Sequence, residues 1–144
     1  MHAPKTFEIL LVEDNLHDAQ LIKIAFSKCD HRVNVSYVSN GEAALDFLNQ
    51  VNNVRPDLIL MDLSLSGMHG MELLREIKKN SALLSLKVVV LTGSRWDGDV
   101  REVAKMNADG YVVKPMDFNG LIETVNDIGS FLQGTKTLPL KMEK

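Results

Sequence analysis

Short runs of apolar residues alternate along the chain with longer stretches in which apolar residues recur at helical spacing. The runs predict strands at residues 7–12, 33–38, 58–61, 87–91 and 110–113. The stretches that follow them predict helices at 16–28, 41–51, 70–79, 98–107 and 118–132. Five repeats of a strand followed by a helix predict an α/β domain, with a parallel sheet covered by helices on both faces and joined by right-handed crossovers.

The predicted helices gather apolar side chains on one face, as helices that cover a sheet do. In residues 16–28 these are Ala19, Ile22, Ala25 and Phe26. In residues 118–132 they are Phe118, Leu121, Ile122, Val125, Ile128 and Leu132. Asn40 and Asp117 precede their helices and are predicted N-caps, because their side chains can accept a hydrogen bond from the first turn.

The chain has 144 residues, which suits one domain, and we expect it to span residues 1–132 with a tail at 133–144. A frayed end is the expectation for this tail, although Leu138, Pro139 and Leu140 could dock. The net charge is −3 and no basic run exceeds Lys78-Lys79, so a nucleic-acid partner is not expected.

The only cysteine is Cys29, which excludes an intrachain disulfide and fits a reducing compartment. The apolar run at residues 9–12 is too short for a signal-peptide core or a membrane span. The expectation from these observations is a cytoplasmic protein without a membrane partner.

Acidic residues stand at the ends of two predicted strands. Asp62 follows the run at 58–61, and Glu13 and Asp14 follow the run at 9–12. Ligands of open parallel sheets bind at the carboxyl ends of the strands. If the two strands are neighbours, three carboxylates converge there, and their repulsion is costly unless a cation or a proton neutralises it.

Two further strand ends complete a set of residues suited to phosphoryl chemistry. Thr92 ends one run and Lys114 the next. Paired carboxylates can hold Mg²⁺, and Asp62 could then act as an oxygen nucleophile toward a phosphoryl group. Lys114 would neutralise charge on the phosphoryl oxygens, and Thr92 could donate a hydrogen bond to one of them.

In these motifs the chain resembles the receiver domain of two-component response regulators. The matches are Val12-Glu13-Asp14-Asn15, Met61-Asp62, Leu91-Thr92 and Tyr111-Val112-Val113-Lys114-Pro115, and the resemblance runs from about residue 7 to 132. It implies a flavodoxin-like, doubly wound sheet of five strands in the order 2-1-3-4-5 with five helices. It also implies a signalling module rather than an enzyme, one that catalyses only its own phosphorylation and dephosphorylation.

The resemblance assigns roles residue by residue. Asp62 would accept the phosphoryl group from a histidine kinase or a phosphotransfer protein. Asp14, Asp62 and the Ser64 carbonyl would ligate Mg²⁺, with Glu13 acting mostly through water. Lys114 would bind the phosphoryl group, and Thr92 and Tyr111 would be the switch pair that alters a partner-binding face.

The chain departs from the family pattern at Ser66, where a proline is usual, and at Glu13, where aspartate is commoner. Shorter segments, such as Arg55-Pro56-Asp57, resemble stand-alone receivers that partner phytochrome kinases. Such receivers are often homodimers, and the expectation from this resemblance is a stand-alone protein without a DNA-binding output domain. The role of Trp96, in the loop after the fourth predicted strand, stays open between a partner contact and a cover for the core edge.

Two other functions compete with this interpretation. A phosphatase of the haloacid dehalogenase type also uses Asp, Thr or Ser, Lys and Mg²⁺. That family places its nucleophile on the first strand with a second acid two residues later, whereas here Asp62 is on the third strand and Ser64 follows. The other alternative is an unphosphorylated adaptor with the receiver fold, against which the complete set of site residues argues.

Overall fold

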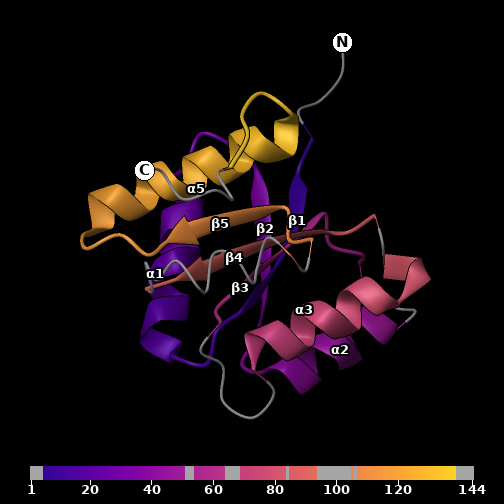
Figure 1. Ribbon diagram of the computed structural model, residues 1–144. Helices are drawn as coiled ribbons and strands as arrows, with labels where there is room; N and C mark the ends of the chain where they lie inside the picture. The colour runs from indigo at the N-terminus through magenta and orange to yellow at the C-terminus, as the bar shows by residue number, and fades with distance from the viewer. Residues whose placement is uncertain are drawn as a thin grey trace.

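A five-stranded parallel sheet forms the centre of the molecule (Figure 1). The computed structural model describes residues 5–50, 54–63, 69–83, 85–93, 105 and 107–138, and of Thr92 only the backbone. The strands are β1 (Phe7–Val12), β2 (Val33–Val38), β3 (Leu58–Met61), β4 (Lys87–Thr92) and β5 (Gly110–Val113). Their order is β2-β1-β3-β4-β5. The predicted strands and the predicted order are therefore confirmed.

Four of the predicted helices are present in the described segments. They are α1 (Leu16–Ser27), α2 (Gly41–Asn49), α3 (Gly70–Lys79) and α5 (Phe118–Gln133). A short 3-10 turn, Ser81–Leu83, follows α3. The fifth helix, predicted at residues 98–107, falls outside the described residues except for Lys105 and Asn107. Trp96 lies outside them as well.

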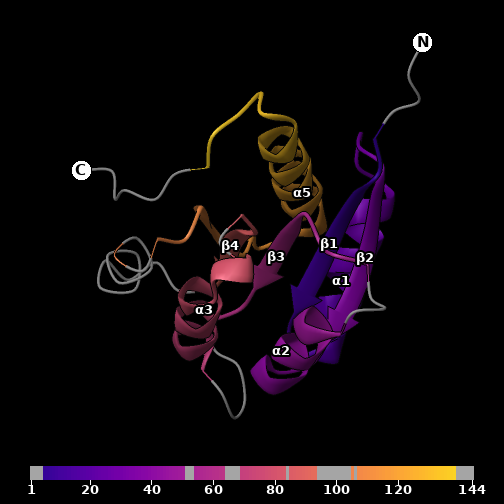
Figure 2. The same cartoon turned by 90° about the vertical axis from the view of Figure 1, so that its right-hand side faces the viewer.

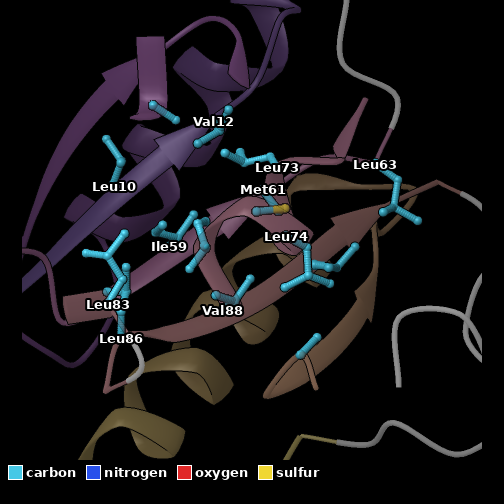
Figure 3. Packing of buried hydrophobic residues seen from close by; sticks show 14 of the residues in the cluster. Leu10, Val12, Ile59, Met61, Leu63, Leu73, Leu74, Leu83, Leu86 and Val88 are labelled. Atoms are coloured by element: carbon cyan, nitrogen blue, oxygen red, sulfur yellow. The ribbon is translucent and has the colours of Figure 1, made fainter. Parts of the chain in front are cut away.

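The helices cover the two faces of the sheet in pairs, α1 with α5 and α2 with α3 (Figure 2). Alternation along each strand divides the core between the two faces. Leu10 and Val12 of β1 pack on the α2 and α3 side, whereas Ile9 and Leu11 pack on the α1 and α5 side. Figure 3 shows part of the first cluster, to which β1, β3, β4 and α3 contribute. Both faces of the central strands are buried, which explains their unbroken apolar runs.

Side-chain caps start the helices at defined residues. The predicted caps Asn40 and Asp117 accept hydrogen bonds from the backbone N–H groups three residues later. His69 caps α3, and Asn15 caps α1 by accepting from the Asp18 N–H at 3.0 Å. Because Asn15 caps α1, the carboxylate of Asp14 is not needed for this purpose.

The C-terminal segment packs against the domain at least as far as Leu138. Gly134, with a left-handed φ of 82°, ends α5. Leu138 is only 8% exposed and joins the cluster under α1 and α5. A Cβ atom at Gly110 would lie 2.9 Å from the Leu138 Cβ, so β5 makes room for this side chain. The expected frayed end is therefore wrong up to Leu138, and residues 139–144 lie outside the described part.

No helix in the described segments combines the length and the apolar character needed to cross a bilayer.

Gly70, the first residue of α3, lies close to the backbone that follows β3, which predicts a specific sensitivity to a larger side chain at this position. A Cβ atom at Gly70 would lie 2.6 Å from the Asp62 carbonyl oxygen and 2.7 Å from the Leu63 Cα, both of them backbone atoms. We expect Gly70→Ala to lower the free energy of unfolding by about 1–3 kcal/mol in urea titrations, because the backbone must shift. Gly93→Ala is the matched control, since no atom of the described residues lies within 4 Å of its added Cβ. Equal stability of the two variants would contradict the close approach.

Candidate functional site

Three carboxylates converge where β1 and β3 end. The two strands are paired with Val12 opposite Met61, so the next residues, Glu13 and Asp62, leave the sheet side by side. Oxygen atoms of Glu13, Asp14 and Asp62 all lie within 4.8 Å of one another. The Glu13 side chain is 2% exposed and that of Asp62 is 9% exposed, whereas Asp14 is exposed to solvent. The predicted convergence of acids is confirmed.

Lys114 supplies the positive charge at the centre of this cluster. It follows β5, which pairs with β4, and its side chain reaches across the edge of the sheet. Its Nζ lies 2.7 Å from Glu13 Oε1 and 2.8 Å from Asp62 Oδ2, and 3.2 Å from Asp18 Oδ2. Hydrogen bonds between charged groups in a partly buried place are stronger than those between neutral groups.

The surroundings shift the pKa values of the buried partners. Burial raises the pKa of Glu13 above its usual value, the neighbouring Asp62 charge adds to the rise, and Lys114 opposes it. Burial alone would lower the pKa of Lys114, but its hydrogen bonds to Asp62 and Glu13 outweigh burial and raise that pKa. Lys114 therefore stays protonated at neutral pH and remains a fixed counter-charge.

The donor atoms of the cluster fit a hard divalent cation. Carboxylate oxygens are the protein ligands that Mg²⁺ and Mn²⁺ prefer. Three carboxylates and one ammonium leave excess negative charge at this edge of the sheet, which a divalent cation would offset. Glu13, Asp14 and Asp62 could hold such an ion, while the predicted third ligand, the Ser64 carbonyl, lies outside the described residues.

The remaining predicted residues lie on β4 and β5. Thr92 is the last residue of β4, paired with Val113, and its side chain is outside the described part. Tyr111 lies on β5 with 6% exposure and packs in the cluster under α2 and α3. The structure thus brings Thr92 and Lys114 to the same edge as Asp62, and buries Tyr111 within β5, three residues before Lys114.

Two site residues were missed by the sequence analysis. Asp18, in the first turn of α1, contacts Lys114, and the Tyr37 hydroxyl donates a 2.6 Å hydrogen bond to the Glu13 carbonyl. Burial and the charges of Glu13 and Asp14 raise the pKa of Tyr37, so its hydroxyl keeps the proton that it donates. A signal existed for Asp18, because side chains in a first helical turn lean toward the N-terminus and hence toward the preceding strand end.

The family model of the response regulator receiver domain matches residues 9–126. The chain belongs to this family. The receiver motifs identified in the sequence are therefore those of a signalling protein of two-component systems. The five parallel strands in the order 2-1-3-4-5 agree with this assignment.

Among curated relatives, this receiver resembles the probable methanogenesis regulatory protein FilR2 of Methanothrix harundinacea. The two are 35% identical over 142 residues, covering 96% of this chain and 92% of the relative. It also resembles the response regulator Rcp1 of Synechocystis, at 39% identity over 137 residues, covering 91% of this chain and 92% of Rcp1.

Solved structures of similar receivers share the fold. The phosphorylated cyanobacterial phytochrome response regulator RcpA has a TM-score of 0.84 and 35% identity, covering 94% of this chain and 99% of RcpA. The Mn²⁺-bound form of Rcp1 has a TM-score of 0.80 and 36% identity, covering 92% of this chain and 99% of that one.

The role of Lys114 as a counter-charge predicts competition with a divalent cation. We expect Lys114→Met to lower the free energy of unfolding by about 1–3 kcal/mol in EDTA, because Glu13 and Asp62 lose their partner in a partly buried place. Added Mn²⁺ should then raise the melting temperature of the variant more than that of the wild type, since binding to the folded state stabilises it.

Lys136→Met serves as the control, because Lys136 pairs with Asp127 at 2.8 Å on the exposed surface of the molecule. This variant should respond to Mn²⁺ as the wild type does. An equal rise in melting temperature for Lys114→Met and Lys136→Met would contradict the assigned role of Lys114.

Proposed function

We propose that the protein is a response regulator that accepts a phosphoryl group on Asp62 and thereby changes its affinity for a partner. The observation that carries the proposal is the position of Lys114 Nζ, 2.8 Å from Asp62 Oδ2 among three carboxylates at the end of the sheet. This arrangement places a carboxylate nucleophile beside a cation that can stabilise negative charge on a phosphoryl group.

The proposed reaction is a substitution at phosphorus. An oxygen of Asp62 attacks the phosphorus of a phosphohistidine on a kinase or phosphotransfer protein. The new phosphorus–oxygen bond forms as the phosphorus–nitrogen bond breaks, and the histidine leaves with the electron pair. Hydrolysis reverses the modification, since water attacks the phosphorus and the Asp62 carboxylate is released together with inorganic phosphate.

The residues around Asp62 suit this reaction. Asp62 lies 2.8 Å from the Lys114 ammonium, and the carboxylate partners of Lys114 raise its pKa, so the counter-charge beside the nucleophile persists at neutral pH. We assign Mg²⁺ to Glu13, Asp14 and Asp62, where it would supply further neutralisation of the phosphoryl oxygens when bound. That the related Rcp1 has a Mn²⁺-bound form supports the proposal that this protein binds a divalent ion.

The same proposal includes a switch. An aspartyl phosphate would offer the Thr92 hydroxyl a hydrogen-bond acceptor and so draw Thr92 toward it. The side chain of Tyr111, on the neighbouring strand, would then change position as well. The change is a shift between two populated states, biased by the added charge. Tyr111 is buried in this structure, so a movement of its side chain would change the packing beneath the partner-binding face.

The names of the relatives suggest the class of partner. Rcp1 is a response regulator, and RcpA is described as a phytochrome response regulator. We propose a histidine kinase of the phytochrome type as the phosphoryl donor.

A phosphatase of the haloacid dehalogenase type is disfavoured, because Asp62 follows β3 rather than β1 and Ser64 stands where that family has its second acid.

Acetyl phosphate with Mg²⁺ tests the acceptor directly. We expect the intact mass of the wild-type protein to rise by one phosphoryl group and that of Asp62→Asn to stay unchanged, because the nucleophilic oxygen is lost. Asp46→Asn, which removes an exposed carboxylate from α2, should be labelled as the wild type is.

Labelling of Asp62→Asn at the wild-type level would show that another residue accepts the group. No labelling of the wild type would instead favour an adaptor that is never phosphorylated. Turnover of a generic phosphate monoester would favour the phosphatase.

A further inference from the structure

Asp18 makes a contact with Lys114 that has no assigned role. Its Oδ2 accepts a hydrogen bond from Lys114 Nζ at 3.2 Å. Asp18 comes from α1, whereas the other two acceptors follow β1 and β3. The cap formed by Asn15 fixes the Asp18 backbone, since Asn15 Oδ1 accepts from its N–H. The position of Asp18 at the start of α1 therefore places its carboxylate next to the Lys114 ammonium.

The three contacts use all the donors of the ammonium. A lysine Nζ has three N–H donors and no acceptor. Glu13, Asp62 and Asp18 take one each, at 2.7, 2.8 and 3.2 Å. A phosphoryl oxygen can therefore gain a hydrogen bond from Lys114 only if one of the three carboxylates gives up its own.

Asp18 is the partner that is easiest to release. It makes the longest of the three contacts, and its side chain is 39% exposed, against 2% for Glu13 and 9% for Asp62. A carboxylate that leaves the ammonium at an exposed position is rehydrated, whereas a buried one is left without a partner. A phosphoryl group carries more charge than a carboxylate and so competes well for the ammonium.

We propose that Asp18 is a positioning residue that holds Lys114 in the resting state and yields it to a phosphoryl oxygen during transfer. The inference rests on the proposed function, because it assumes that Asp62 is the acceptor. Asp18 does not touch the reacting atoms and acts only through the ammonium. It thus restrains phosphorylation, and its removal should make Lys114 more available.

The test measures the rate of phosphoryl incorporation from acetyl phosphate with saturating Mg²⁺, followed by intact mass after quenching. We expect Asp18→Asn to react about 2- to 5-fold faster than the wild type, the factor that corresponds to an exposed ion pair. Asp18→Glu retains the charge and should react at the wild-type rate. Asp46→Asn removes the same charge from exposed α2 and should also leave the rate unchanged.

A double-mutant cycle separates this role from simple repulsion of the incoming phosphoryl group. In a Lys114→Met background, Asp18→Asn should no longer change the rate, because the competition for the ammonium is gone. The same acceleration in both backgrounds would overturn the proposal, since it would show direct repulsion alone. An unchanged or slower rate for Asp18→Asn with wild-type Lys114 would overturn it as well.

The two proposals can fail separately. If the wild type is never labelled, the proposed function fails and the role of Asp18 fails with it. If the wild type is labelled on Asp62 and Asp18→Asn is labelled at the same rate, only the role of Asp18 fails.

Discussion

The site depends on one lysine ammonium held among carboxylates that would otherwise repel one another. Lys114 Nζ lies within 2.8 Å of both Glu13 and Asp62, and these two side chains are almost fully buried. Like charges in such a place are costly unless an opposite charge is near. Because the lysine neutralises them only in part, the cluster keeps its attraction for a divalent cation and its capacity to act as a nucleophile. In the proposed reaction the same ammonium would bind an oxygen of the transferred phosphoryl group.

The order and register of the strands bring Lys114 and the carboxylates together. A sheet with β1 and β3 at its centre places their ends side by side, and β4 and β5 bring Thr92 and Lys114 to the same edge. The two apolar clusters bury the strands on both faces, so close packing holds the strands that end at this edge. The close approach of Gly70 to the Asp62 carbonyl links the start of α3 to the proposed acceptor. Residues that stabilise the fold and residues proposed for the reaction therefore lie side by side at the strand ends.

Much of this architecture could be predicted from the sequence, because buried parallel strands leave a strong pattern. The strand bounds, the caps Asn40 and Asp117 and the convergence of Glu13, Asp14 and Asp62 all follow from local patterns. The place of Asp18 in the first turn of α1 indicates only that its side chain leans toward the end of β1. Its contact with Lys114, and that of Tyr37 with Glu13, depend on how segments far apart in the sequence pack together. The packing of Leu138 against Gly110 likewise joins segments far apart in the sequence. Contacts between single side chains that are far apart in the sequence could therefore not be predicted.

The proposed function requires that Asp62 itself becomes an acyl phosphate. Reduction of the phosphorylated protein with borohydride converts an aspartyl phosphate to homoserine, and peptide sequencing by mass spectrometry then locates it. We expect a single converted residue at position 62, present only after treatment with both acetyl phosphate and Mg²⁺. Conversion at Asp14 or another carboxylate, or none in a protein that has gained a phosphoryl group, would contradict it.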